Sequence, residues 1–437
     1  MNNPTPASGV PDDSCDGVNC CERPSPSALR ASAGSIGIDP SLPCQMGCGD
    51  TREAIAVVQD PLEINALVLR HHETVCVIVT LDALYVGDDL RSCVISELEH
   101  ALRPEELFLA ASHTHYAPFL DRSKPLLGAV SSQHLADVSR RCAVLIKRLL
   151  EDEGEPVSIE SVRYETFAPI NRRMYRLVGG AEGRVRFRSV FLGPNKEGTG
   201  TQYGHLVQLV GESGPVAIVW QLPCHPTSLP EGWGHSAHFV GEGRGFLREL
   251  VGAPVPVLFV QGFSGDLRPA SVGVAVTRSD RVRRRLLGEW FVPFGPDEYQ
   301  AWLSGVTAEL AAAYKKLKPS SSSEISVHRA EEPLSLYYSG VEEGKHMICH
   351  TIAFGDVAIV GLSAEPVSGY AAHLTSRRRR MYIPAGCIDD VVGYGPTELM
   401  LNEGGYEGGA FLKYFGAEGV NPGFQTRLLR LMLDGAI

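Results

Sequence analysis

The sequence has little that would place the protein in a membrane or outside a cell. No stretch approaches the roughly 18 to 20 uncharged apolar residues that span a bilayer, and the longest apolar run, Val75 to Leu81, has the length of a strand. The N-terminus lacks the basic, apolar and small-residue segments of a secretory signal. The eleven cysteines are odd in number and follow no disulfide framework. We therefore expect a cytoplasmic protein without a stable membrane anchor.

An excess of basic charge is also missing. The chain carries 40 Lys and Arg against 51 Asp and Glu, a formal net charge of −11, which disfavours general attraction to phosphate backbones. The basic runs Arg281 to Arg285 and Arg377 to Arg380 contain no recognition motif, so we interpret them as solvated helix faces. We expect no nucleic-acid partner and leave small molecules as the open class of ligand.

The composition is that of a globular protein, with 44% hydrophobic and 21% charged residues. Residues 1–34 are rich in Pro, Ser, Asn and Asp and are predicted to form a flexible leader. Five cysteines precede residue 50 without a Cys-x2-Cys pair, so we interpret them as loose thiols and not as a zinc cluster. Residues 35–437 contain no repeat or strong linker, which predicts one domain.

Within that domain, apolar residues run almost continuously through the predicted strands, which is typical of sheets buried on both faces. The predicted helices are 88–102, 133–152, 243–252, 296–317, 366–376 and 422–434. The predicted strands are 64–69, 75–81, 107–111, 156–166, 205–211, 216–223, 256–261, 324–330, 347–354 and 357–362. The pattern predicts a mixed α/β fold.

Polar residues that can carry chemistry follow three of these apolar strands. In Ser112-His113-Thr114-His115 the two histidines share a face of an extended segment, and neutral imidazoles suit zinc. The second strand ends in Cys224-His225-Pro226, and the third in Gln261-Gly262 followed by Gly265-Asp266. Each motif alone is also compatible with an ordinary polar loop, a structural histidine or a turn.

Together these segments resemble the catalytic domain of the neutral/alkaline ceramidase family, zinc-dependent amidohydrolases that cleave an N-acyl amide. The resemblance runs from about Ser35 to Tyr414. It includes the Ile170-Asn171-Arg172 turn, Ala364-Glu365-Pro366, and the pair Tyr394 and Tyr406, which is spaced twelve residues apart as in the family. It implies two central β-sheets flanked by helices, and Zn²⁺ held by His113, His225, Glu365 and Tyr394.

The resemblance also implies active-site roles for residues around that metal. His115 and Tyr406 are expected as hydrogen-bond donors near the developing oxyanion, and Arg172 as a further active-site residue. For Tyr406 the alternative is a core aromatic beside a glycine-rich loop. Asp266 is either a turn former or a carboxylate that orients a ligating imidazole.

The sequence departs from the family in three respects. Arg268 occupies the place of a family serine, and a protonated guanidinium cannot act as a nucleophile, which favours direct attack by water. A planar guanidinium can instead bind a substrate carboxylate; the alternative is a surface arginine after a turn. The family's C-terminal β-sandwich and an export signal are not recognised in the sequence. The absence of each argues against ceramide as substrate.

We therefore predict a zinc-dependent amidohydrolase that acts on a small, soluble, carboxylate-bearing N-acyl amide. Water activated by zinc attacks the carbonyl, His115 or Tyr406 helps to stabilise the oxyanion, and an unspecified group protonates the leaving amine. The alternatives are hydrolysis of an ester or lactone, amide formation, and a non-catalytic metal- or ligand-binding protein. The oligomeric state stays open.

Overall fold

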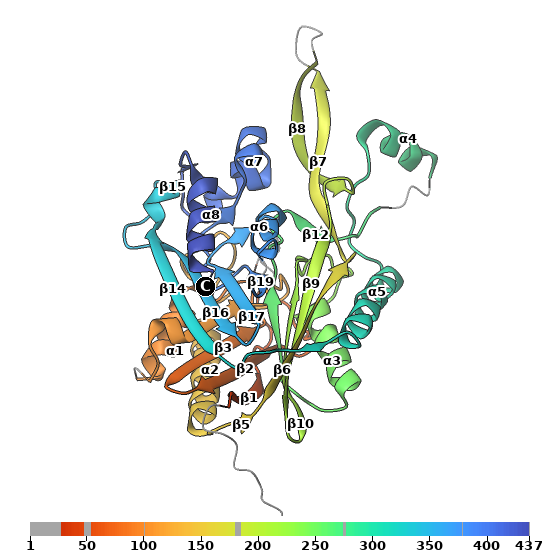
Figure 1. Cartoon of the computed structure of the whole chain (residues 1–437). Helices are drawn as coiled ribbons and strands as arrows, with labels where there is room; N and C mark the ends of the chain where they lie inside the picture. Colours follow the sequence, from red (N-terminus) through yellow and green to blue (C-terminus); the bar gives the residue numbers. More distant parts are fainter. Residues whose placement is uncertain are drawn as a thin grey trace, which may run out of the picture.

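The computed structural model describes residues 28–47, 54–99, 101–179, 185–273, 277–377 and 379–436. Three sheets surround a central core, and helices cover their outer faces (Figure 1). The predicted mixed α/β fold with helices flanking central sheets is confirmed, and the structure adds a third, four-stranded sheet. Among the described helices, none combines the length and apolar character needed to cross a membrane.

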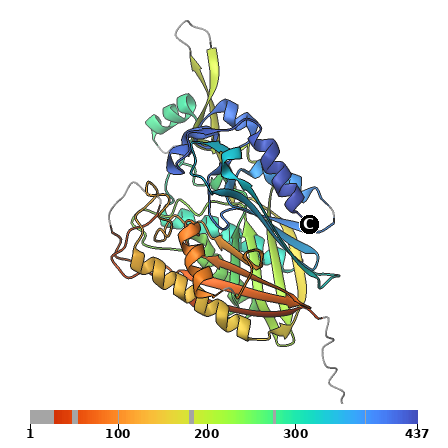
Figure 2. The same ribbon diagram turned by 90° about the vertical axis from the view of Figure 1, so that its left-hand side faces the viewer.

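The first sheet has five strands and is covered on its outer face by two helices (Figure 2). Its strands, in spatial order, are β4 (Leu107–Ala111), β3 (Thr74–Leu81), β2 (Glu63–His71), β1 (Arg30–Gly37) and β5 (Glu155–Pro156). The helices are α1 (Gly87–Glu97) and α2 (Ser132–Glu151). Ser131 caps α2, and Leu135, Val138, Cys142 and Leu149 follow helical spacing and pack on the sheet.

The second sheet, also of five strands, carries α3 (Phe239–Val251) and α5 (Pro296–Tyr314) on its outer face. Its strands are β11 (Val257–Gln261), β10 (Gly214–Leu222), β9 (Gln202–Gly211), β6 (Ser158–Thr166) and β13 (Lys318–Pro319). Along β11, Leu258 and Val260 enter the central core, whereas Val257 and Phe259 contact the helices. This alternation explains why the strand is apolar at every position.

The third sheet is covered by α6 (Ala371–Thr375) and α8 (Phe424–Gly435). Its strands are β14 (Ile325–Pro333), β16 (His346–Phe354), β17 (Val357–Leu362) and β19 (Met381–Ala385). Val357 and Ile359 of β17 complete the central core, and Ala358 and Val360 face α6 and α8. All three sheets contain one parallel pair, namely β3 with β4, β10 with β11, and β17 with β19.

A smaller sheet projects from this body and was not predicted as strands (Figure 1). It consists of β12 (Leu267–Pro269), β7 (Pro169–Gly179) and β8 (Val185–Asn195). The predicted turn at Ile170-Asn171-Arg172 is wrong, because these residues lie in β7, where Ile170 and Asn171 pair with β12. The helix α4 (Arg278–Leu287) lies beside the hairpin, and α7 (Glu398–Glu403) contacts β8.

The start of the folded body differs from the prediction. Strand β1 begins at Arg30, so the last residues of the segment predicted as a leader belong to the first sheet. Ala31 is buried there although its surroundings in sequence are polar and small. Residues 1–27, with three of the N-terminal cysteines, and Cys48 lie outside the described residues, and the division into leader and single domain stays a prediction.

Candidate metal centre

The candidate site lies where the parallel strand pairs end. His113 follows β4, His225 follows β10, and Glu365 follows β17 in the short strand β18 (Glu365–Pro366). Tyr394 begins β20 (Tyr394–Gly395) and is the register partner of Glu365. Parallel strands end at one edge of a sheet, where polar side chains can meet without interrupting the ladder. The four predicted ligands are therefore brought together from three sheets.

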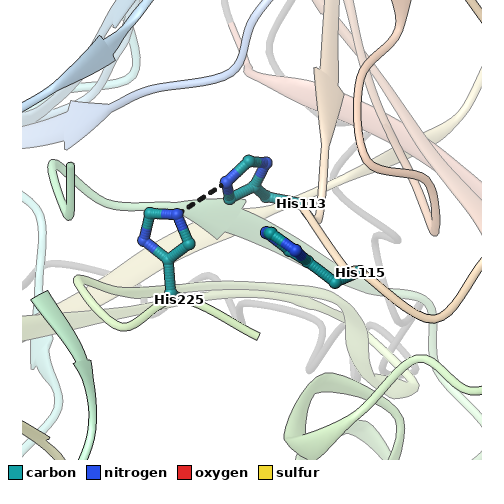
Figure 3. A group of neighbouring side chains, drawn as sticks. All are labelled: His113, His115 and His225. Atoms are coloured by element: carbon teal, nitrogen blue, oxygen red, sulfur yellow. Dashed lines mark hydrogen bonds between the residues drawn. The ribbon is translucent and has the colours of Figure 1, made fainter. Parts of the chain in front are cut away.

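Three of these residues converge with short separations. His113 Nε2 lies 3.0 Å from His225 Nε2 (Figure 3). Glu365 Oε2 lies 3.3 Å from the first nitrogen and 3.2 Å from the second. All three side chains are buried. We call His113, His225 and Glu365 the His–Glu cluster.

The other ring nitrogens decide what the cluster can bind. His113 Nδ1 donates to the carbonyl oxygen of Leu84 at 3.0 Å, and His225 Nδ1 donates to that of Ser264 at 2.9 Å. A carbonyl accepts only, so both protons are placed on Nδ1 and both Nε2 atoms present a lone pair to the cluster. Glu365 Oε2 has no hydrogen-bond partner among the described residues. Three acceptors thus face one another and require a cation between them.

The electrostatics of the two imidazoles agree with that requirement. Burial lowers the pKa of His113, but Cys387 and Glu365 beside it raise the pKa well above the usual value. Burial and the neighbouring His113 lower the pKa of His225 to about 4. Without a metal, a proton on His113 therefore supplies the positive charge that the carboxylate needs, and a metal ion would displace it.

The fourth predicted ligand, Tyr394, belongs to a network around Arg172. The Arg172 guanidinium donates from Nε to Glu407 Oε1 at 2.7 Å and from Nη2 to the Gly265 carbonyl oxygen at 2.6 Å. The same Nη2 lies 3.3 Å from the Tyr394 hydroxyl oxygen. Tyr406 packs edge-on against Tyr394 with ring centroids 5.3 Å apart, and it is 36% exposed. Arg172 thus positions one phenol, and Tyr406 lies at the surface above it.

His115 lies beside the cluster without joining its closest contacts. Its ring centroid is 5.1 Å from that of His113 and 5.7 Å from that of His225, and one nitrogen of each ring lies within 4.8 Å of the others. His115 Nε2 is buried and has no hydrogen-bond partner in the described parts of the chain. Burial and the charges of His113 and His225 lower its pKa well below the usual value, so the ring is neutral at pH 7.

The prediction that Asp266 orients a ligating imidazole is wrong. Its carboxylate accepts hydrogen bonds from the Ser368 amide at 2.7 Å and from Asn171 Nδ2 at 2.8 Å. The imidazoles are oriented instead by the carbonyls of Leu84 and Ser264. Asp266 therefore links β7 to the loop after Glu365. This is a structural role, without a hydrogen bond to His113 or His225.

Arg268 is not the exposed arginine of the alternative interpretation. It is partly buried in β12, donates to Ser228 Oγ, and lies with its guanidinium carbon 4.3 Å from the centre of the Phe291 ring. Its Nε is buried without a hydrogen-bond partner, and no carboxylate of the described residues forms an ion pair with it. Burial, together with the charge of Arg172, lowers its pKa to about 10.

One residue of the site was missed in the sequence. Tyr85 lies in the loop after β3, and its hydroxyl donates to Glu365 Oε1. Its ring stacks on His113 with centroids 5.4 Å apart and an interplanar angle of 26°. The available signal was its place just beyond a buried strand that neighbours β4, but no motif marks it.

Ceramidases are among the solved structures to which the chain is similar. Neutral ceramidase from Pseudomonas aeruginosa superposes with a TM-score of 0.71 and 14% identity, over 93% of this chain and 74% of that chain. A ceramidase complexed with C2 gives a TM-score of 0.69 and 14% identity over the same shares. The chain has the neutral ceramidase fold. The predicted resemblance is thereby confirmed, and at this identity it concerns the fold alone.

Two further comparisons, with protein families and with curated proteins, find no match. The roles of individual residues consequently depend on the geometry of this chain.

Proposed function

We propose that the protein is a zinc-dependent hydrolase that cleaves the N-acyl amide bond of a small, carboxylate-bearing molecule. The observation that carries the proposal is the His–Glu cluster, in which two imidazole lone pairs and an unpartnered carboxylate oxygen face one another at 3.0 to 3.3 Å. The neutral ceramidase fold supports amide hydrolysis as the reaction class.

The donor set and its spacing favour zinc. With Zn–N bonds of about 2.0 to 2.1 Å, the edges of a tetrahedron measure about 3.3 Å, close to the separations of the three donor atoms. His113, His225 and Glu365 would hold the ion, with the Tyr394 hydroxyl as a further ligand. When bound, zinc would act as a Lewis acid that activates water and polarises a carbonyl.

Other residues of the chain would bind and orient the reacting groups. The neutral His115 can hold a proton or a hydrogen bond at its unpartnered Nε2, within reach of a substrate group beside the cluster. Arg172 holds the Tyr394 hydroxyl through Nη2, while Glu407 fixes the guanidinium. Tyr406 is partly exposed and packs against Tyr394, so its ring would contact the acyl group of a substrate bound there.

Arg268 provides the reason to expect a carboxylate on the substrate. A buried guanidinium without an anionic partner is costly, and a planar carboxylate could bind it in bidentate fashion. The charge of Arg172 lies close enough to lower the pKa of Arg268, and it raises the local positive potential further.

This subsite is tested with Arg268→Met, which keeps the length of the side chain and removes the charge. Loss of one partner of a desolvated charge pair typically costs about 2 kcal/mol or more, equivalent to about 30-fold in binding. We expect the KM for carboxylate-bearing N-acyl amides to rise by about that factor, with little change for their methyl esters. An equal KM for both enzymes on the carboxylate substrates would refute the subsite.

The main test combines metal analysis with untargeted metabolite turnover. We expect about one zinc per chain in the wild-type protein, and its loss together with activity in His113→Ala and Glu365→Ala. His205→Ala is the matched control, because His205 is a buried histidine that bonds to Gln221 at 2.6 Å outside the cluster. Zinc without turnover of amides, esters or lactones would favour a binding protein, and absence of zinc would overturn the proposal.

A further inference from the structure

The two oxygens of Glu365 have different surroundings. Oε2 faces the imidazoles of His113 and His225 and has no hydrogen-bond partner in the described structure. Oε1 accepts a hydrogen bond from the Tyr85 hydroxyl. One oxygen of the carboxylate thus contacts the phenol, and the other faces the two imidazoles.

We propose that Tyr85 is a positioning residue that keeps Glu365 a one-oxygen ligand of the metal. This inference rests on the proposed function, because it concerns the same metal site. With Oε1 engaged by the phenol, only Oε2 would be available to the ion, which would leave a position for substrate or water. Hydrogen-bonding partners of a metal ligand fix its orientation and contribute to metal affinity.

The surroundings of Tyr85 leave its hydroxyl little freedom. The side chain is 3% exposed, stacks on His113, and contacts Phe119 edge-on with centroids 6.4 Å apart. The Lys124 ammonium group lies 5.9 Å from the centre of its ring and is itself bonded to Asp121 and, at 2.9 Å, to Asp390. A ring held on several sides in this way aims its hydroxyl at a fixed point.

Removing this hydroxyl would free Oε1 inside a buried site. A buried carboxylate oxygen without a donor is unfavourable, so it would turn toward the nearest positive charge, which is the metal. Glu365 would then bind through both oxygens and fill the open position. We expect the second oxygen to change the coordination, and we expect weaker binding because the hydrogen bond that orients the carboxylate is lost.

The experiment compares Tyr85→Phe with the wild-type protein in two measurements that do not depend on activity. Zinc affinity is measured by competition with a chelator, and coordination is followed by the visible absorption of the Co²⁺-loaded protein. We expect zinc affinity to fall by about 10- to 100-fold and the Co²⁺ bands to weaken, as they do when coordination number increases. Phe keeps the ring and its packing.

Tyr337→Phe is the matched control. The Tyr337 hydroxyl also donates to a carboxylate, Glu332 Oε2 at 2.6 Å, but it lies outside the metal site. The control should leave zinc affinity and the Co²⁺ spectrum unchanged. If the wild-type protein binds zinc and turns over amides, and Tyr85→Phe has the same zinc affinity and Co²⁺ spectrum, this inference is overturned and the proposed function stands. A wild-type protein that binds no zinc would overturn both.

Discussion

Two buried polar clusters meet the loop after β3, and they balance charge in different ways. The first is the His–Glu cluster. The second, which we call the arginine cluster, contains the ion-paired side chains of Glu63, Asp82, Arg244 and Arg248, with Asp60 near Asp82 and Arg244. In it, Arg244 binds Asp82 through two hydrogen bonds of 3.0 and 2.6 Å, and Arg248 binds Glu63 through two of 2.9 and 2.8 Å.

The difference lies in the kind of cation. Arginine stays protonated in any protein environment, so the arginine cluster carries its compensating charge permanently. Imidazoles can lose their protons, so the His–Glu cluster can exchange a proton for a metal ion. The arginine cluster fixes the packing of α3 against the first sheet. The His–Glu cluster leaves the compensating charge to be supplied from outside, which suits a functional site.

The largest effect is expected from breaking the arginine cluster. Asp82→Ala leaves the buried Arg244 without its closest partner, which typically costs about 3 to 5 kcal/mol of unfolding free energy. Denaturant titration of the metal-free protein measures this. The control is Asp137→Ala, which removes a more exposed pair with Arg141 on α2 and should cost less than about 1 kcal/mol. Similar losses in the two variants would show that the buried pair of Asp82 and Arg244 is no more important for stability than the exposed pair.

The pH dependence of the same cluster gives the next effect. Burial raises the pKa of Asp60 to about 6 despite the hydrogen bond from Ser236. A raised folded-state pKa contributes stability below the unfolded value near 3.8, and this contribution is lost as pH rises through 6. Relative to Asp60→Asn, the wild-type protein should lose about 2.4 kcal/mol between pH 4 and pH 7, most of the about 3 kcal/mol that the full pKa shift represents.

Glu63 provides the control of opposite sign. Burial raises its pKa, but the stronger combined effect of Arg248 and Arg244 lowers it to about 2. Its contribution is therefore present above the unfolded value near 4.5 and is lost only as pH falls toward 2. Glu63→Gln should consequently match the pH slope of the wild-type protein between pH 5 and pH 7. A wild-type protein and an Asp60→Asn variant with parallel stability curves would refute the assignment.

Metal addition should act on the His–Glu cluster alone. Zinc at 100 times its Kd should stabilise the metal-free wild-type protein by about 2.7 kcal/mol, measured as an increase in the denaturation midpoint. Asp60→Asn should show the full gain, and His225→Ala little of it. A full gain in His225→Ala would place the metal elsewhere.

The smallest effect is expected for Glu365→Gln, and it tests directly how the two clusters differ. Glu365→Gln removes a buried charge as Asp82→Ala does, but in the metal-free protein His113 can release its proton in response, whereas Arg244 cannot. We therefore expect an unfolding free energy within about 1 kcal/mol of the wild-type value. A loss as large as that of Asp82→Ala would show that the His–Glu cluster is structural.

Much of the fold could be read from the sequence because buried strands need apolar side chains on both faces. That pattern located most strands of the three large sheets, including β11 and β17, whose residues alternate between two cores, but it did not locate β13 or β19. It missed β1, which is short of large apolar residues, and the β7–β8 hairpin, which projects from the body. Helix α1 also ends at Glu97, before the predicted limit at residue 102.

The candidate site could be predicted in part for the same reason. Histidines and a glutamate placed just after buried strands are recognisable in sequence, and His113, His225, Glu365 and Tyr394 do converge. Asp266 was misassigned because sequence cannot distinguish a carboxylate that bonds to an imidazole from one that bonds to a backbone amide. Tyr85 was missed because its partner lies 280 positions away.

The sequence by itself determined the mixed α/β class and the positions where polar side chains follow apolar strands, since both depend on local periodicity. Only the tertiary structure decided which atoms meet. The carbonyls of Leu84 and Ser264 turn both Nε2 lone pairs toward Glu365, and the Tyr85 hydroxyl occupies its other oxygen. Hydrogen bonds act over about 3 Å, so their pattern depends on how sheets pack, which no local pattern specifies.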